Sequence, residues 1–354
     1  MSRIKVFLGA FVNYTNAQNL NCLALARYLD KSKYDVMTGV GYSGELSVET
    51  IPGVKYFYAR YPAKIFFPLC FIYGILWCDV AYLPVSGHWK LYRFLLRLLR
   101  KKAFKTVEAM MIGTNLSKLT GQGLSIDEIR TSLDYTGHTY SITRAMRDVN
   151  EQRIGLKSED HILYLGTEYQ KFYNGIPRKA LTDIAIIGSN LFYKGIEDFF
   201  HIASVFPNLN FHVIGSGMGK IDFPQEIEKR NLKNLKWHGP ESHEQLKKSL
   251  ENIQLHVFPS RAEGFPKVTL ETAAAGVPSV VYDDYGANEW ITSGKNGFVV
   301  KSVNDMITVI QDLLDHPEKL QPLADNAREL AKSFDWKVRI KDWEKVIDLI
   351  AAER

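Results

Sequence analysis

Two glutamates flank a turn and the start of a helix in the stretch EGFPKVTLETAAAGVP, residues 263–278. Glu263 precedes a Gly-Phe-Pro turn, and Glu271 lies eight residues later, beside a run of small residues. If both were helical, they would be separated by roughly 12 Å along the axis. That exceeds the roughly 5–9.5 Å between the two carboxyl groups that flank a glycosidic bond in hydrolases. The spacing therefore favours one elongated ligand contacted at two places.

Backbone donors lie between the two acids. Glu263 would contact one end of the ligand and Glu271 a second hydroxylated portion, while Pro266 fixes the turn. Either glutamate alone is more often a solvated surface residue, and only the combination is specific. The N–H groups expected to contact the middle of the ligand belong to Gly264, Phe265, Lys267 and Val268.

Strand-like apolar runs alternate with helical patterns along the whole chain. One series occupies the N-terminal half and a second begins near Thr182, with the turn-rich piece 173–179 between them. Such repetition predicts two parallel sheets covered by helices on both faces, in two domains that face each other across a cleft. We expect domains at 1–175 and 176–335, and a final amphipathic helix in 336–354 that returns across the junction.

Parallel sheets bind ligands beyond the carboxyl ends of their strands, where helix N-termini present free N–H groups. Gly215, Gly217 and Gly219 do not form GxGxxG, because the sixth position is Lys220, and a Walker A motif fails at Ile214 and Ile221. A nicotinamide dehydrogenase and a P-loop kinase are thus disfavoured. Four strand ends together still predict a phosphate-bearing ligand: 186–190 leading to Lys194, 213–220, 237–241 and 258–267.

Composition limits the class of protein. With 354 residues and 46% hydrophobic content, the chain can bury two cores. Its three cysteines show no CxxC spacing, so we expect neither disulfides nor a zinc site, and a cytoplasmic setting. The N-terminus shows no signal peptide pattern.

Positive charge is concentrated in one segment. Residues 60–107 hold nine Lys/Arg and one acid, a net +8 within a chain of +5. In 88–105, cations at 90, 93, 97, 100 and 101 fall near one helical face, which is typical of a helix bound to an anionic membrane surface. A solvated basic face is the alternative. The apolar run 64–78 is too short to span a bilayer, and no nucleic-acid motif accompanies the charges.

The pattern from Glu263-Gly-Phe-Pro to Glu271, with the tail AAAGVPSV, resembles the signature of glycosyltransferase family 4 (glycosyl transferases group 1). These are retaining nucleotide-sugar enzymes of the GT-B fold, with two Rossmann-like domains that bind acceptor and nucleotide sugar respectively. The segments GSNLFYKG (188–195), LGTEYQKF (165–172), TYSITRAMRDV (139–149) and FDW (334–336) also resemble pieces of that family.

The resemblance implies a role for each matching residue. Glu271 would bind the nucleotide ribose, Glu263 the donor sugar and Lys194 the diphosphate, so that a cation and N–H dipoles stabilise the charge on the leaving group. No metal or cofactor is implied, and UDP is expected more than GDP as the donor nucleotide. The remaining contacts would come from Gly188, Ser189, Asn190 and Gly215, with His238, Gly239 and Pro240 bordering the base.

The sequence departs from the family pattern at three places. Ser189 stands where the family has arginine, which leaves Arg261 and Lys267 as candidates for the second diphosphate cation. Glu108 replaces a frequent histidine, and we hypothesise that it contacts acceptor or donor hydroxyls as a third catalytic residue. On the acceptor side, the loop that contains Gly9, Asn13 and Tyr14 lacks the family's paired glycines.

The resemblance thus implies a retaining, metal-independent hexosyltransferase. It would move a hexose or N-acetylhexosamine to a saccharide or polyprenyl-linked acceptor in surface polysaccharide or glycolipid synthesis, peripheral at the inner face of a bacterial cell membrane. Two alternatives remain: a GT-B UDP-sugar 2-epimerase, and a catalytically silent GT-B subunit that binds a partner glycosyltransferase. The missing arginine favours the silent subunit.

Overall fold

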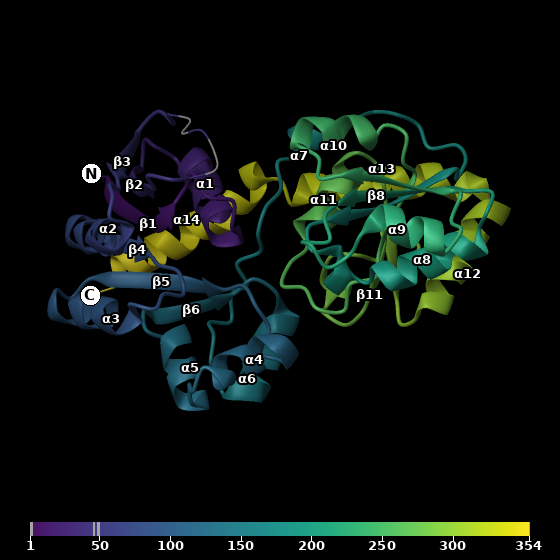
Figure 1. Ribbon diagram of the computed structural model, residues 1–354. Coiled ribbons are helices and arrows are strands. Elements are labelled where there is room, and N and C mark those ends of the chain that lie inside the picture. The colour runs from purple at the N-terminus through teal and green to yellow at the C-terminus, as the bar shows by residue number, and fades with distance from the viewer. Residues whose placement is uncertain (1–2, 45–46, 48–49, 354) are drawn as a thin grey trace. The chain divides into compact units, whose positions relative to one another are not determined.

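A computed structural model describes residues 3–44, 47 and 50–353 (Figure 1). The chain divides into two compact units, Met1–Leu165 with Trp336–Arg354, and Gly166–Asp335. The first boundary lies ten residues before the one we expected at 175. The reason is that Tyr169 and Phe172, on the short helix α7 (Tyr169–Phe172), pack into the core of the second unit.

The first unit is built on a six-stranded parallel sheet in the order β3-β2-β1-β4-β5-β6. Its strands are β1 (Ile4–Phe11), β2 (Tyr34–Val40), β3 (Val54–Tyr58), β4 (Val80–Tyr82), β5 (Lys102–Val107) and β6 (Gly137–Ser141). Its helices are α1 (Ala17–Tyr28), α2 (Ala63–Trp77), α3 (Trp89–Leu98), α4 (Gly113–Gly121), α5 (Ile126–Leu133), α6 (Arg144–Ile154) and α14 (Trp336–Ala352).

The second unit repeats this construction in a six-stranded parallel sheet of order β12-β11-β10-β7-β8-β9. Its strands are β7 (Asp183–Gly188), β8 (Asn210–Gly215), β9 (Leu235–Gly239), β10 (Leu255–Phe258), β11 (Ser279–Tyr282) and β12 (Gly297–Val300). The longer helices are α8 (Ile196–Val205), α9 (Phe223–Lys229), α10 (His243–Ser249), α11 (Lys267–Ala274), α12 (Val303–Asp315) and α13 (Leu320–Ser333), with 3-10 turns η1 (Leu191–Lys194), η2 (Ala287–Glu289) and η3 (Pro317–Lys319).

Strand β7 shows why the second sheet is apolar on both faces. Successive side chains of a strand point to opposite faces. Ile184 and Ile186 join the apolar cluster that contains residues of α8 and α12, whereas Ala185 and Ile187 join the cluster that contains residues of α11 and α13. A strand covered on both faces reads as a continuous apolar run, which is the pattern that predicted it.

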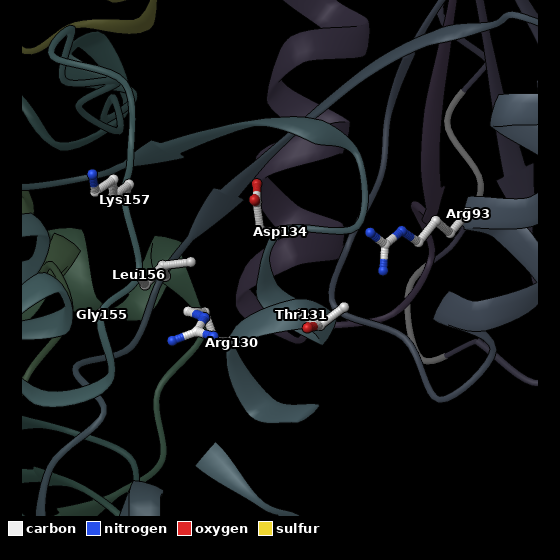
Figure 2. A pocket seen from close by; sticks show the side chains of 7 residues that line it. All are labelled: Arg93, Arg130, Thr131, Asp134, Gly155, Leu156 and Lys157. Carbon is white, nitrogen blue, oxygen red and sulfur yellow. The ribbon is translucent and has the colours of Figure 1, made fainter. Parts of the chain in front are cut away.

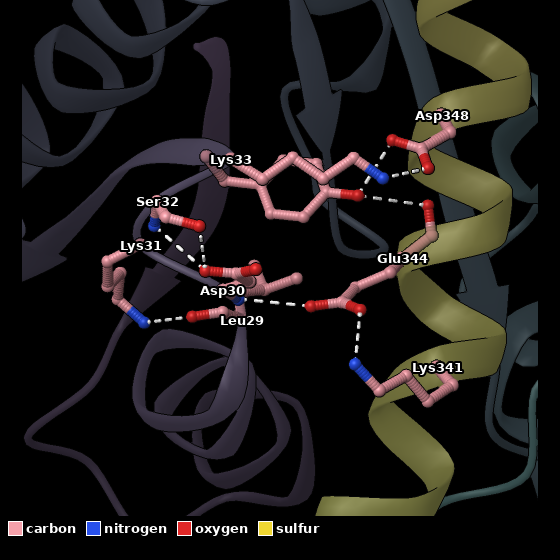
Figure 3. Close-up of polar contacts among 9 residues, drawn as sticks. Leu29, Asp30, Lys31, Ser32, Lys33, Lys341, Glu344 and Asp348 are labelled. Atoms are coloured by element: carbon pink, nitrogen blue, oxygen red, sulfur yellow. Dashed lines mark hydrogen bonds and ion pairs between the residues drawn. The ribbon is translucent and has the colours of Figure 1, made fainter.

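Helix α14 belongs to the first unit, although it is the last element of the chain (Figure 1). Asp30 N–H donates to Glu344 Oε1 at 3.0 Å (Figure 3). Tyr34 Oη donates to Asp348 Oδ1 at 2.7 Å. Trp343 is fully buried, with its ring 5.3 Å from that of Tyr82. The expected helix at 336–352 is confirmed, and its described contacts anchor it to the first sheet and to α1.

The expected basic helix through residue 101 is wrong in its C-terminal part. Helix α3 ends at Leu98, and Arg100 takes a left-handed conformation with φ 50°. Lys101 points inward, where its Nζ donates to Cys78 O at 2.6 Å. Long-range pairing of β5 with β4 and β6 fixes residues 102–107 as a strand.

The structure also contains elements that the sequence patterns did not predict, among them strand β3 and helices α4, α5, α12 and α13. The cysteines Cys22, Cys70 and Cys78 are free and buried. Among the helices of the described residues, none has the length and apolar content required to cross a membrane.

Candidate functional site

Lys194 and Glu263, 69 residues apart in sequence, form an ion pair in the second unit. Lys194 Nζ lies 2.6 Å from Glu263 Oε1, and the side chains are only 23% and 12% exposed. Ser260 Oγ donates to the same carboxylate oxygen at 2.7 Å. The two residues expected to bind the diphosphate and the donor sugar are therefore neighbours.

A glycine explains how the two segments come together. Gly195 has φ 77°, and a Cβ at this position would lie 2.1 Å from Pro259 O. Only a residue without a side chain lets the start of α8 approach the end of β10 this closely. The approach places Lys194 Nζ 5.1 Å from the centre of the Phe258 ring and within reach of the loop that carries Glu263.

Two further glycines lie at the carboxyl edge of the sheet beside this ion pair. Gly188 and Gly215 end the adjacent strands β7 and β8 in register, with φ 155° and 137°. A Cβ on Gly215 would lie 1.8 Å from Gly188 O. Because neither residue carries a side chain, a ligand can reach the backbone at the carboxyl ends of the strands.

A cavity of about 350 Å³ lies at this edge. Six of the residues expected to bind the nucleotide sugar line it: Gly188, Ser189, Gly215, Pro240, Val268 and Glu271. The remaining lining residues are Ile187, Ile214, Ser216, Glu241, His243 and Leu246. Of these, Ser216, Glu241 and His243 are polar and were not among the expected site residues, although Glu241 directly follows the Gly239-Pro240 turn and His243 lies two residues further on.

Glu271 lies on α11 and is partly buried. Burial raises its pKa to about 7, although the nearby Lys267 and Lys171 oppose the shift. Burial also lowers the pKa of His243. Ligand hydroxyl groups that donate hydrogen bonds to Glu271 would stabilise the charged form of its carboxyl group.

Glu241 presents an unused acceptor close to the same cavity. Its Oε1 accepts a hydrogen bond from Ser249 Oγ at 2.9 Å. Its Oε2 is buried and has no hydrogen-bond partner among the described residues. A buried acceptor without a donor is costly, so a ligand donor at this position would be stabilising.

The turn that follows Glu263 is fixed by aromatic packing. Phe265 is 9% exposed, and its ring centre lies 4.9 Å from that of Trp290 and 5.8 Å from that of Phe334. Pro266 precedes the first turn of α11, and its carbonyl accepts hydrogen bonds from both N–H and Oγ1 of Thr269. Gly264 and Lys267 lie on either side of Phe265 and Pro266 in the sequence.

Several expected site residues have other partners in the structure. His238 Nε2 lies 3.0 Å from His212 Nδ1, and neither His238 nor Gly239 lines the cavity. Arg261 is bound to Asp284 at 2.8 Å and lies over the Tyr282 ring. Its guanidinium would have to leave that carboxylate to serve as the second diphosphate cation.

Asn190 adopts a left-handed conformation with φ 58° in the turn between β7 and η1. Its Oδ1 is buried and lacks a hydrogen-bond partner among the described residues. Asparagine tolerates this backbone conformation better than most residues. Within the described residues, no group of three His, Cys, Asp or Glu side chains is placed to hold a metal ion.

The expected acceptor-side residues lie in the first unit and mostly serve its own fold. Asn13 is buried, and its amide both donates to Gly41 O and accepts from Gly41 N–H, at 2.7 and 2.8 Å. Gly9 is buried within β1, where a Cβ would lie 2.9 Å from Leu83 Cδ2. Tyr14 Oη is 3.0 Å from Ser43 Oγ.

Glu108 directly follows the last residue of β5, at the carboxyl edge of the first sheet. Its Oε1 accepts hydrogen bonds from Asn21 Nδ2 at 2.9 Å and Thr106 Oγ1 at 3.2 Å. It is partly buried, and these two donors are neutral. Its position at the carboxyl end of a strand agrees with the expected contact to ligand hydroxyls.

Comparison with known proteins shows that part of the chain is similar to one family. Residues 174–330 match the model described as "Glycosyl transferases group 1". An uncharacterized glycosyltransferase of Methanocaldococcus jannaschii is 27% identical over 184 residues, which are 50% of this chain and 52% of that protein. N,N'-diacetylbacillosaminyl-diphospho-undecaprenol alpha-1,3-N-acetylgalactosaminyltransferase of Campylobacter jejuni is 28% identical over 47% of this chain and 44% of its own. The chain spans about half the length of the curated relatives it matches.

Solved structures match the whole chain. Sucrose-phosphate synthase of Thermosynechococcus elongatus aligns with a TM-score of 0.76, covering 100% of both chains at 16% identity. Anabaena HepE in complex with UDP-glucose aligns with a TM-score of 0.72, covering 98% of this chain and 100% of its own at 15% identity. The prediction of a GT-B fold with two parallel α/β sheets is confirmed.

Proposed function

We propose that this protein transfers a hexose or N-acetylhexosamine from a nucleoside-diphosphate sugar to an acceptor, with retention and without a metal ion. The observation that carries the proposal is the ion pair of Lys194 and Glu263 beside the glycine edge of the second sheet. A diphosphate fits that edge because it needs a cation and exposed backbone donors. The match of residues 174–330 to glycosyl transferases group 1 supports the same conclusion.

Donor binding would exchange the partners of this ion pair. The diphosphate would replace Glu263 as the partner of Lys194, and sugar hydroxyls would donate to the carboxylate that Lys194 leaves. Glu271, whose pKa is raised to about 7, would accept hydrogen bonds from the ribose hydroxyls. As the sugar–phosphate bond breaks, negative charge grows on the diphosphate, and Lys194 stabilises that charge more than it stabilises the ground state.

A leaving phosphate oxygen can itself accept the proton of the acceptor hydroxyl on the same face of the sugar. The protein then needs no separate nucleophile, and its contribution is orientation and charge stabilisation. Glu108 is the proposed hydroxyl contact from the first unit. Gly9 and Asn13 take no part in the proposed reaction, because their contacts serve the packing of the first unit.

We further propose a lipid-linked saccharide as acceptor and a peripheral position on an anionic membrane. The support lies in α2, which presents an exposed apolar face in addition to the basic segment 88–105. The exposed residues on that face of α2 are Ile65, Leu69, Tyr73 and Leu76, at about one-turn spacing. The Campylobacter relative is named for an undecaprenyl-diphosphate-linked acceptor.

A panel of UDP- and GDP-sugars, with and without a metal chelator, tests the function. We expect release of one nucleoside diphosphate and a product with the anomeric configuration of the donor. An epimerase would instead return an isomeric nucleotide sugar, and a silent subunit would leave every donor unchanged. Co-sedimentation with vesicles tests the location, and equal binding to neutral and anionic vesicles would remove the membrane proposal.

A further inference from the structure

A second cavity, of about 240 Å³, lies in the first unit and is lined by residues of α3, of α5 and its end, and of the segment that follows α6 (Figure 2). Arg93 from α3 and Arg130 from α5 line it, together with Lys157, which follows the end of α6. Asp134 is its single carboxylate. The remaining lining residues are Thr131, Gly155 and Leu156.

Two of the three cations have no ion pair or hydrogen bond of the side chain within the described part of the chain. Arg130 lies in the last turn of α5, where a cation offsets the partial negative charge of the helix end, and it is bound to Asp127 at 2.6 Å. Asp134 accepts a hydrogen bond from Thr139 Oγ1 at 2.8 Å. Arg93 and Lys157 are the two cations without such a contact among the described residues. The cavity therefore holds positive charge without a partner.

The position of Arg93 on α3 connects the cavity to an apolar surface. At 100° per residue, the residues of α3 fall into three sectors. Tyr92 and Leu96 are buried, while Leu91, Phe94 and Leu98 are 40%, 59% and 64% exposed. The third sector holds Lys90, Arg93 and Arg97, adjacent to the exposed apolar one. This order of sectors is typical of a helix that binds at a membrane interface with its cations at the level of the headgroups.

We infer that this cavity binds a phosphate ester, namely the headgroup phosphate of an anionic phospholipid such as phosphatidylglycerol. Arginine matches phosphate oxygens with paired N–H donors, and Lys157 adds a point charge. Thr131 and Asp134 supply polar groups for headgroup hydroxyls. A soluble phosphate ester of glycerol has the same chemistry and is the second possible source. The inference rests on the proposed membrane location, but it concerns a site that takes no part in the proposed transfer.

Two double variants of the full chain test the site. Arg93→Gln/Lys157→Gln removes the two unpaired cations of the cavity. Lys90→Gln/Arg97→Gln is the matched control, because it removes two cations of the same helix sector that do not line the cavity. Both are first compared with the parent by thermal unfolding. Should the cavity double fail to fold, Lys157→Gln alone is used, since Lys157 is exposed.

Binding is measured by co-sedimentation with phosphatidylcholine vesicles, with and without phosphatidylglycerol, and by calorimetric titration with glycerol 3-phosphate. Each cation near an anionic surface contributes about fivefold, so the control loses roughly 25-fold in vesicle binding. We expect the cavity double to lose about tenfold more than the control, because it also loses bidentate contacts to one headgroup.

If the cavity double variant loses more vesicle binding than the control double variant, the ligand is a lipid headgroup. If the two double variants differ only in their affinity for glycerol 3-phosphate, the cavity is a phosphate site whose ligand is a soluble ester. Equal behaviour of the two doubles in both measurements overturns the inference. Sugar transfer is assayed separately, so a failure of the proposed activity and a failure of this site are distinguishable.

Discussion

The two sheets have the same strand order, yet their carboxyl edges differ. In the second unit, β7 ends in Gly188 beside Gly215, and backbone is accessible there to a ligand. In the first unit, β1 ends at Phe11, and Asn13 closes the following loop by hydrogen bonds to Gly41. Topology brings loops to one edge in both units. Whether an edge can bind a phosphate is decided by glycines that leave the backbone accessible and by polar groups whose hydrogen bonds are not all made within the fold.

The acidic residues at the two edges differ in the same way. Glu263 is paired with a lysine that a ligand phosphate can take over. Glu108 is held by the neutral donors Asn21 and Thr106, which need no replacement when a ligand arrives. We therefore assign the electrostatic part of the proposed reaction to the second unit and only hydroxyl contacts to the first.

The largest effect is expected for Lys194→Ala. Loss of the cation that stabilises the leaving diphosphate should lower kcat/KM by about 10²–10³. The control is Lys229→Ala, an exposed lysine at the end of α9 in the same unit, which should leave turnover unchanged. Equal kinetics for the two variants in a transfer assay would remove Lys194 from the site.

Gly215→Ala should be the most destabilising change at the glycine edge. Its Cβ would lie 1.8 Å from Gly188 O, and φ is 137°, so we expect a loss of about 3 kcal/mol in the free energy of unfolding. Gly219→Ala is the control, because φ is 73° there but nothing lies within 4 Å of the added Cβ. It should cost about 1 kcal/mol. Similar costs in denaturant unfolding would show that the close approach is not needed.

Glu271 should make stability depend on pH. Its pKa is raised to about 7 in the folded protein, so between pH 4.5 and 7 the folded state binds more protons than the unfolded state. Stability should fall as pH rises through this window. Relative to the parent, the stability of Glu271→Gln should therefore rise with pH by about 3 kcal/mol in total and level off above pH 8.

The same variant separates stability from binding. Nucleotide affinity of the parent should increase as Glu271 ionises, because the carboxylate accepts ribose hydroxyls better than the neutral acid does. Glu271→Gln should bind more weakly and lose this pH dependence. A variant with unchanged affinity at every pH would place the ribose elsewhere.

The smallest effect is expected in the first unit. Glu108→Ala should lower turnover by about tenfold, since a contact to a hydroxyl group is worth about as much as one hydrogen bond to a charged group. Asn21→Ala serves as the comparison, because it removes a donor to Glu108 but leaves the carboxylate in place. Unchanged kinetics for Glu108→Ala would give this residue a purely structural role.

Much of the second sheet could be predicted because strands such as β7 and β10 are short apolar runs followed by a turn. The end of the helix in the basic segment 88–105 could not be predicted. Its cations continue at helical spacing past Leu98, whereas long-range pairing makes residues 102–107 a strand. The sequence assigned Lys194 and Glu263 to the same ligand but did not predict that they contact each other, because it gives no distance between residues that are 69 positions apart. Glu241 was missed because its buried, unpaired Oε2 is a property of the fold alone.

The proposed function depends most on where a nucleotide binds in the second unit, and a crystal structure with UDP or GDP tests this directly. We predict that the diphosphate lies against Gly188 and Ser189 within hydrogen-bonding distance of Lys194 Nζ, and that the ribose hydroxyls donate to Glu271. A nucleotide bound away from these residues, with Lys194 still paired to Glu263, would contradict the central claim.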